Sequence, residues 1–159
     1  TRAPFACCAT LLREGGNENS LPTSKQITIS HELYSAICRK AAMPSSQQDQ
    51  MLIGGSNFGD VTLRVDRVGL ISMLSIAEPV LSFLPWPNAQ GGAASSGLLI
   101  VGQMGGLYLL THDGEDFVVR EWHLYSDLMS AASFGNFVVH SCSGDCYVSE
   151  LKDPCEDAA

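Results

Sequence analysis

The chain has 159 residues, of which 45% are hydrophobic and only 16% are charged, so it can bury the core of one ordinary domain and is not intrinsically disordered. Its formal net charge of -8 argues against a direct nucleic-acid surface, since such a surface needs clustered Lys and Arg. No apolar run approaches the roughly 18 residues of a membrane-spanning helix, and the low charged fraction indicates that another molecule covers part of the surface.

The N-terminal third predicts one strand and one helix. Pro4–Leu12 is short, apolar and typical of a strand, and a glycine-containing turn ends it. The following Gly15–Ser24 is polar and typical of a loop. A short segment rich in β-branched residues, Gln26–Ile29, comes next. We interpret 15–50 as an insertion that carries the helix.

Ser30–Ala42 is predicted to be that helix. The Ser30 hydroxyl can accept a hydrogen bond from a free amide of the first turn, and two basic residues in the last turn suit the helix dipole. The helix is either a lid on its own sheet or a docking element for a partner. Its predicted apolar face consists of Leu33, Tyr34, Ile37 and Ala41.

From Gln50 onward the chain is predicted to be almost entirely β. The loop 86–97 is expected to be flexible, and the acidic tail 152–159 is expected to be loose. The predicted strands are Met51–Gly54, Val61–Val65, Leu70–Ile76, Val80–Leu84, Leu98–Val101, Leu107–Thr111, Phe117–Leu124, Leu128–Ala132, Phe137–His140 and Cys146–Leu151.

Three predicted hairpins share one pattern, in which an apolar run reaches a small-residue turn and a second apolar run follows. Their sequences are MLIGGSNFGDVTLRV, LLIVGQMGGLYLL and FVVHSCSGDCYVSEL. Aligning Gly59, Gly105 and Gly144 gives steps of 46 and 39 residues. A unit of about 40 to 50 residues with four short antiparallel strands is typical of a propeller blade. An immunoglobulin-type sandwich also has short strands, but it does not predict a hairpin that recurs at near-equal steps.

We therefore predict an all-β fold: a WD40-like β-propeller segment of about two to three blades with one helical insertion, in which 1–159 is part of a single domain. Phe5–Leu12 is expected to be the inner strand of the first blade. Because so few blades cannot close a ring, and open ends would leave edge strands, we expect the chain to be a fragment of a longer polypeptide.

The glycines of Gly102–Gly106 raise the question of a phosphate site. Phosphate loops present their amides at the start of a helix, whereas a strand follows this loop. Turn chemistry therefore explains these glycines, and we predict no cofactor and no small-molecule ligand.

No pattern of catalytic residues stands out. Neither GxSxG nor a Cys/His signature occurs, and the acidic turn Thr111–Asp116 lacks the alternating oxygen ligands of a calcium loop. His112 is expected to be solvated beside Asp113. We predict that the chain is not an enzyme and has no catalytic site. The four histidines, which lie in unrelated contexts, are His31, His112, His123 and His140.

The cysteines fit no disulfide framework and indicate reduced, mostly buried thiols in an intracellular protein. Cys142 and Cys146 flank a turn and are expected to face each other across a hairpin. The alternative is half of a metal site, which no CxxC pair or histidine completes, so no metal is predicted. The remaining cysteines are Cys7, Cys8, Cys38 and Cys155.

Trp86 lies between two prolines before the loop. It is either an exposed anchor for a partner or a side chain packed against its own blade.

The order of these features resembles a known family. From about Phe5 to Pro154 the chain resembles the N-terminal propeller of the family of the 100-kilodalton Fanconi anaemia-associated protein. The resemblance rests on the order of the hairpins and the helix, without any catalytic motif. It is carried by ITISHELYSAICRK, QMLIGGSNFGDVTLRV, the Glu78-Pro79-Val80 strand start, LLIVGQMGGLYLL and FVVREWHLYSDLMSAASFGNFVVHSC.

This resemblance implies a non-enzymatic scaffold subunit of the Fanconi anaemia core ubiquitin ligase complex in the nucleus. The implied partners are the B subunit and the RING ligase subunit L, and the implied role is to support monoubiquitination of the I–D2 pair in DNA interstrand crosslink repair. The alternatives are the propeller of the B subunit, a propeller of a coat or ciliary transport complex, and a propeller enzyme with its site at the central channel.

Overall fold

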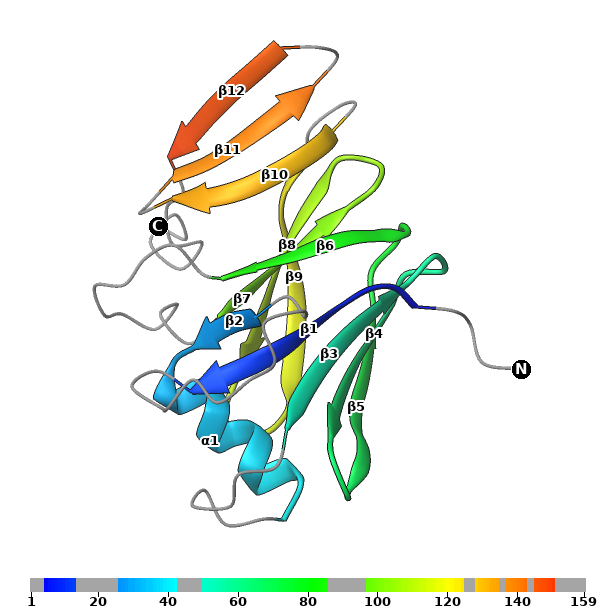
Figure 1. The fold of residues 1–159 in the computed structure, drawn as a ribbon, viewed down its shortest axis with the longest axis vertical. Helices are drawn as coiled ribbons and strands as arrows, with labels where there is room; N and C mark the ends of the chain where they lie inside the picture. Colours follow the sequence, from blue (N-terminus) through cyan, green and yellow to red (C-terminus); the bar gives the residue numbers. More distant parts are fainter. Residues whose placement is uncertain are drawn as a thin grey trace.

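The computed structural model describes residues 5–13, 26–42, 50–85, 97–124, 128–134, 137–142 and 145–150. Apart from one helix the described chain is all-β, as predicted (Figure 1). Trp86, the loop 86–97 except Gly97, and the tail 152–159 lie outside the described residues. The elements are β1 (Phe5–Arg13), β2 (Gln26–Ile29), α1 (His31–Lys40), β3 (Met51–Ser56), β4 (Asp60–Val65), β5 (Gly69–Ser75), β6 (Val80–Pro85), β7 (Leu98–Gly102), β8 (Gly106–His112), β9 (Phe117–Leu124), β10 (Leu128–Phe134), β11 (Phe137–Cys142) and β12 (Asp145–Glu150).

The described strands form three sheets. Sheet I has the order β2-β1-β3-β4-β5, sheet II the order β6-β7-β8-β9, and sheet III the order β10-β11-β12. All neighbouring strands are antiparallel except β1 and β2, which are parallel. Each sheet is thus an antiparallel meander in chain order, and in sheet I the insertion between β1 and β3 adds β2 along the free edge of β1.

The sequence indicated a β-prone segment at β2 but not its pairing. Its register places Ile27 opposite Leu11 and Ile29 opposite Arg13. Ile27 and Ile29 are buried whereas Thr28 between them is exposed, which is the alternation of a strand that covers a core with one face.

The helix α1 has the predicted N-cap. The backbone of Ser30 is extended, and its Oγ accepts a hydrogen bond from the Leu33 amide at 3.2 Å. The predicted apolar face is buried, and Ala36 and Cys38 are buried with it. Among the described residues, no helix is long and apolar enough to span a membrane.

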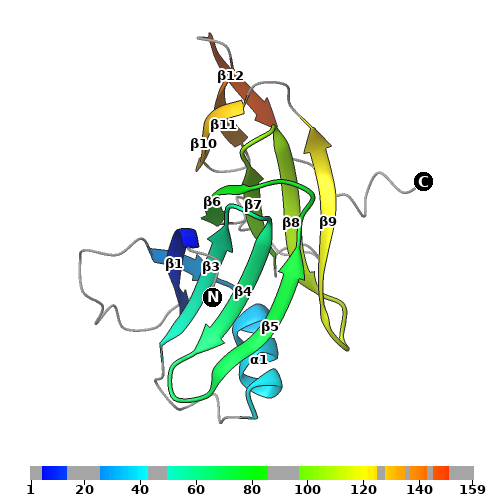
Figure 2. The same cartoon turned by 90° about the vertical axis from the view of Figure 1, so that its right-hand side faces the viewer.

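This helix bridges two sheets. It lies against β1 of sheet I and β8 of sheet II, near the lower ends of both sheets in Figure 2. Lys40 Nζ also lies 3.5 Å from Asp116 Oδ1 in the β8–β9 turn. Both side chains are largely exposed, so this ion pair contributes little. The buried face of the helix holds it in the core, which fits the lid interpretation.

Sheets I and II pack face to face, with β1 beside β6 and β5 near β9. We call the packed face of sheet I its inner face. Its residues are Ala9, Leu11, Met51, Ile53, Val61, Leu63 and Val65, all buried. They share one core with Phe83, Leu98, Ile100, Tyr108, Leu110 and Phe117 of sheet II.

The opposite face of sheet II is buried as well. Its residues are Leu84, Leu99, Val101, Leu107 and Leu109. They belong to the face toward sheet III, whose strand β10 lies beside β6 (Figure 1). The first strands β1, β6 and β10 of the three sheets are therefore neighbours in chain order.

Candidate functional site

The hairpins β3–β4 and β7–β8 end in turns of the same construction. Gly59 has a φ of 89° and Gly105 a φ of 103°, a left-handed conformation that favours glycine. The registers end at Gly55 opposite Val61 and at Val101 opposite Leu107, so both glycines occupy the same turn position. The predicted equivalence of these two hairpins is confirmed.

The third hairpin differs from the other two. Its register pairs Cys142 with Asp145 and Ser141 with Cys146, so only 143 and 144 lie between the strands. The prediction that Cys142 faces Cys146 is therefore wrong, because the shorter turn shifts the pairing by one residue. The side chain of Cys146 is exposed and its thiol is free. The register of the third hairpin is consequently not equivalent to that of the first two.

In the first turn a local hydroxyl caps two backbone amides. Ser56 Oγ accepts hydrogen bonds from the amides of Phe58, at 3.1 Å, and Asp60, at 3.0 Å. This side chain thus satisfies the donors that the strand ladder leaves free at the turn.

In the second turn a distant carboxylate caps the same two positions. Gly102 stands where the first turn has Ser56, so the turn has no hydroxyl of its own. Glu78 Oε1 accepts hydrogen bonds from the amides of Met104, at 2.6 Å, and Gly106, at 3.3 Å. Glu78 Oε2 accepts a third from the Tyr108 hydroxyl at 2.7 Å. The carboxylate is buried and fully engaged by these donors.

Glycine at positions 102 and 106 makes room for this carboxylate. A Cβ at Gly102 would lie 2.1 Å from Glu78 Oε1, and a Cβ at Gly106 would lie 2.3 Å from Glu78 Oε2. The phosphate question raised by this loop therefore has a structural answer. Its amides do hold an anion, but the anion is the carboxylate of the protein's own Glu78.

Tyr108 is a permanent donor to this carboxylate. Burial, the hydrogen bond to Glu78 and the negative charges of Glu78 and Glu121 raise the pKa of its hydroxyl far above the usual value. The hydroxyl therefore keeps its proton over the whole physiological pH range.

Both turns hold the linker Ile76–Val80, which joins sheet I to sheet II. The Ile76 amide donates to the Gly59 carbonyl at 2.9 Å. The Gln103 amide donates to the Pro79 carbonyl at 2.8 Å, and Gln103 Nε2 donates to the Val80 carbonyl at 3.2 Å. The linker also runs close to the first turn, since a Cβ at Gly59 would lie 2.4 Å from the Ile76 carbonyl oxygen.

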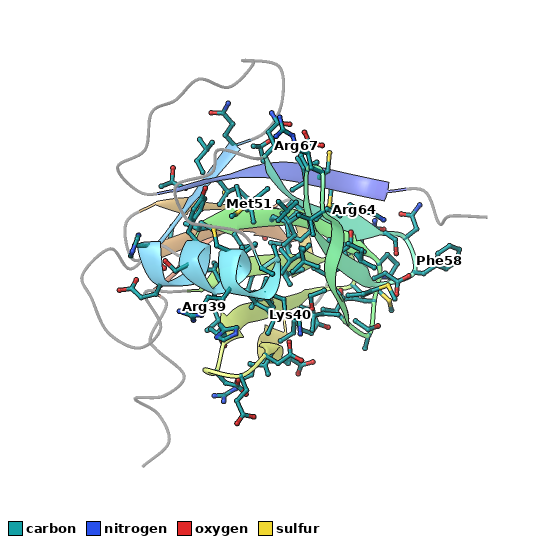
Figure 3. All side chains as sticks on the ribbon, turned by 90° about the horizontal axis from the view of Figure 1, so that it is seen from below. Arg39, Lys40, Met51, Phe58, Arg64 and Arg67 are labelled. Carbon is teal, nitrogen blue, oxygen red and sulfur yellow. The ribbon has the colours of Figure 1, made fainter. Side chains whose placement is uncertain are left out.

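The tips of these two turns expose large apolar side chains. Phe58 is 72% exposed and Met104 is 70% exposed, and each directly precedes the left-handed glycine of its turn. Figure 3 shows Phe58 at the periphery of the molecule, pointing away from the sheets. We call Phe58 and Met104 the turn-tip pair. Together with the Glu78 clamp between the turns, they form the candidate functional site, an interaction surface.

The two histidines whose side chains the structure describes, His31 and His112, share no contact. His112 was expected to be solvated, but it is half-buried: its Nδ1 accepts from the Gly114 amide at 3.1 Å and its ring meets Phe117 edge-on at 4.9 Å. His31 is exposed and lies 3.4 Å from Ser35 Oγ. The side chains of His123 and His140 lie outside the described residues.

The acidic turn at 111–116 forms hydrogen bonds within itself. Asp113 Oδ1 accepts hydrogen bonds from the amides of Glu115 and Asp116, both at 2.9 Å. The Asp116 amide, which has the largest effect, and the Glu115 amide lower the pKa of the Asp113 carboxyl. No group of possible metal ligands occurs within the described part of the chain.

Sequence reasoning missed Glu78. Its only local signal is a carboxylate beside Pro79 at the start of an apolar strand, which is equally typical of a solvated linker. The glycines Gly102 and Gly106 are a second, distant signal, but no local sequence rule connects them to Glu78.

No protein-family model matches this sequence, and no curated protein matches it significantly.

Proposed function

We propose that this chain is a β-propeller segment that serves as a non-enzymatic scaffold for other proteins. The propeller is supported by the packing of successive meanders, whose first strands β1, β6 and β10 are neighbours in chain order. The inner face of sheet I and both faces of sheet II are buried, as expected for stacked blades.

The docking function is proposed from one observation, the exposure of the turn-tip pair. Exposed apolar side chains that recur at one end of a structure are typical of protein-binding surfaces. Phe58 and Met104 stand on turns that Ser56 and Glu78 fix by hydrogen bonds. Little backbone freedom is then lost on binding, so these two side chains can act as anchors for a partner.

The assembly that we propose is the Fanconi anaemia core ubiquitin ligase complex, on the strength of the sequence resemblance. In this proposal the protein acts in the nucleus, binds the B subunit and the RING ligase subunit L, and supports monoubiquitination of the I–D2 pair during interstrand crosslink repair.

The test compares three forms of the full-length protein, expressed with an affinity tag in cells that lack the native copy. They are the wild type, a Phe58→Ser/Met104→Ser double variant, and Val148→Ser as a matched control on an exposed apolar residue of β12. After treatment with a crosslinking agent, we measure recovery of the B and L subunits and monoubiquitination of the I–D2 pair. The wild type and the control are expected to recover both subunits, and the double variant is expected to lose at least one of them.

Two outcomes count against separate parts of the proposal. If the wild type recovers neither subunit, the assignment to this complex is wrong. If the double variant binds as well as the wild type, the turn-tip pair is not the docking surface.

A further inference from the structure

The outer face of sheet I, turned away from sheet II, exposes large apolar side chains and also carries three polar ones. Leu70 is 49% exposed and Met73 is 61% exposed on this face. The strand registers arrange its residues in two rows across the sheet. They are Thr10, Leu52, Arg64 and Leu70 in one row, and Cys8, Gly54, Thr62 and Met73 in the other.

Two polar atoms on this face are buried without a partner. Thr62 Oγ1 and Arg64 Nε are inaccessible to solvent, and neither makes a hydrogen bond within the described structure. Orphaned buried groups are rare in folded proteins, because the hydrogen bonds lost with water are not replaced. The guanidinium of Arg64 is also permanently charged. Arg64 as a whole is only partly buried, so the rest of its guanidinium is open to an acceptor from a neighbouring element.

The repeat shows what covers the equivalent face in the next sheet. The step of 46 residues from Gly59 to Gly105 maps Leu52, Gly54, Thr62 and Arg64 onto sheet II. Their counterparts belong to the face of sheet II that packs against sheet I, and all are at most 5% exposed. These counterparts are Leu98, Ile100, Tyr108 and Leu110.

Sheet II also shows how such a face accommodates a polar group. Tyr108 stands at the position of Thr62, and the carboxylate of Glu78 accepts its hydrogen bond. At the position of Arg64 sheet II has the apolar Leu110, which needs no acceptor. At these positions the first sheet therefore has two unmet polar requirements, those of Thr62 and Arg64, whereas the second sheet has none.

We propose that a further antiparallel sheet of the same propeller packs on the outer face of sheet I, and that it brings a carboxylate to Arg64. It would cover Leu70 and Met73 with an apolar face like the inner face of sheet I. A carboxylate suits the guanidinium because the pairing is charge-assisted. This inference rests on the proposed propeller and adds to it the acidic character of the neighbouring blade.

The first measurement is the oxidation rate of individual methionines by peroxide in the full-length protein, purified free of other subunits and read by mass spectrometry. Met104, which is 70% exposed, is the internal reference for Met73. We expect Met73 to be oxidised at least about ten times more slowly than Met104, whatever the protein concentration. Equal rates would show an open face and would overturn the inference together with the propeller. Protection that appears only at high concentration would identify a second copy as the occupant and overturn the inference.

The second measurement tests the carboxylate through Arg64→Met. An arginine with no partner would be replaced without loss, and stability would stay unchanged or rise. Loss of an ion pair would instead leave the carboxylate buried and unpaired. We expect the Tm of the full-length protein to fall by at least about 5 °C, while Arg120→Met, at an exposed strand position, leaves it unchanged. If Met73 is protected but Arg64→Met does not lower the Tm, the proposed carboxylate is wrong and the proposed propeller is unaffected.

Discussion

Glu78 and Ser56 perform the same task in two successive hairpins. The Ser56 hydroxyl caps two amides of its own turn, and the Glu78 carboxylate caps the two equivalent amides of a turn more than twenty residues away. The first cap is local and stabilises only its hairpin. The second ties the hairpin of sheet II to the linker that enters the sheet, so the clamp couples this turn to the start of β6.

Removing the carboxylate is expected to destabilise the protein strongly. Glu78→Ala leaves two amides and the Tyr108 hydroxyl as donors without an acceptor in a buried site. We expect a loss of about 3 kcal/mol, and about half as much for Glu78→Gln, which keeps one acceptor oxygen. Urea unfolding followed by circular dichroism measures both changes. Glu115→Ala, in an exposed turn, serves as the control and should leave stability unchanged. A harmless Glu78→Ala would mean that the clamp contributes nothing.

A serine at Gly102 should reproduce the cap of the first hairpin, but only when Glu78 is absent. In the wild type its Cβ would overlap the Glu78 carboxylate, so Gly102→Ser is expected to cost about 2 kcal/mol. In a Glu78→Ala background the overlap disappears, and the new hydroxyl can accept from the Met104 and Gly106 amides as Ser56 does in the first turn. Gly102→Ser should then restore about 1 kcal/mol.

The effect of Gly102→Ser on stability is thus expected to change sign between the wild type and the Glu78→Ala variant, and a double-mutant cycle measures this change. Additive effects would argue against the structural equivalence of Ser56 and Glu78. Gly102→Ala in the Glu78→Ala background is the matched control, because it adds the Cβ without the hydroxyl and should not restore stability.

The predictable part of this fold is the part encoded by local patterns. Alternation and apolar runs predicted the strands, and the Ser30 cap with its apolar spacing predicted the helix. The equivalence of Gly59 and Gly105 followed from spacing, because a left-handed turn position leaves a glycine in the sequence.

The rest depends on contacts that no local pattern encodes. Glu78 meets Met104, Gly106 and Tyr108 only once β6 has paired with β7, which sets Val80 opposite Gly102, and no local pattern encodes that register. The parallel pairing of β2 depends on how the insertion returns to the sheet. The register of the third hairpin depends on a turn length that the motif around Gly144 does not fix, and the prediction for Cys142 and Cys146 failed for that reason.

The raised pKa of Tyr108 predicts a loss of stability at high pH. In the unfolded chain a tyrosine releases its proton near pH 10, whereas the folded protein keeps the proton on Tyr108 at that pH. The unfolded state then binds fewer protons than the folded state, so the contribution is complete below pH 10 and is lost as pH rises above it. Tyr108→Phe should remove this dependence, which urea unfolding between pH 8 and pH 11 would show as a shallower decline. Parallel curves for the two proteins would contradict the assignment.

The helix α1 is expected to stabilise the sheets through its buried face rather than through its ion pair. Ile37 is 1% exposed in the core between β1 and β8, so Ile37→Ala leaves a cavity and should cost about 3 kcal/mol. Lys40→Ala removes the pair with Asp116, which solvent screens, and should cost at most about 0.5 kcal/mol and nothing measurable at 1 M salt. Urea unfolding of both variants separates the two interpretations of the helix. A docking element would tolerate Ile37→Ala and lose partner binding instead, whereas a lid loses stability in the purified protein alone.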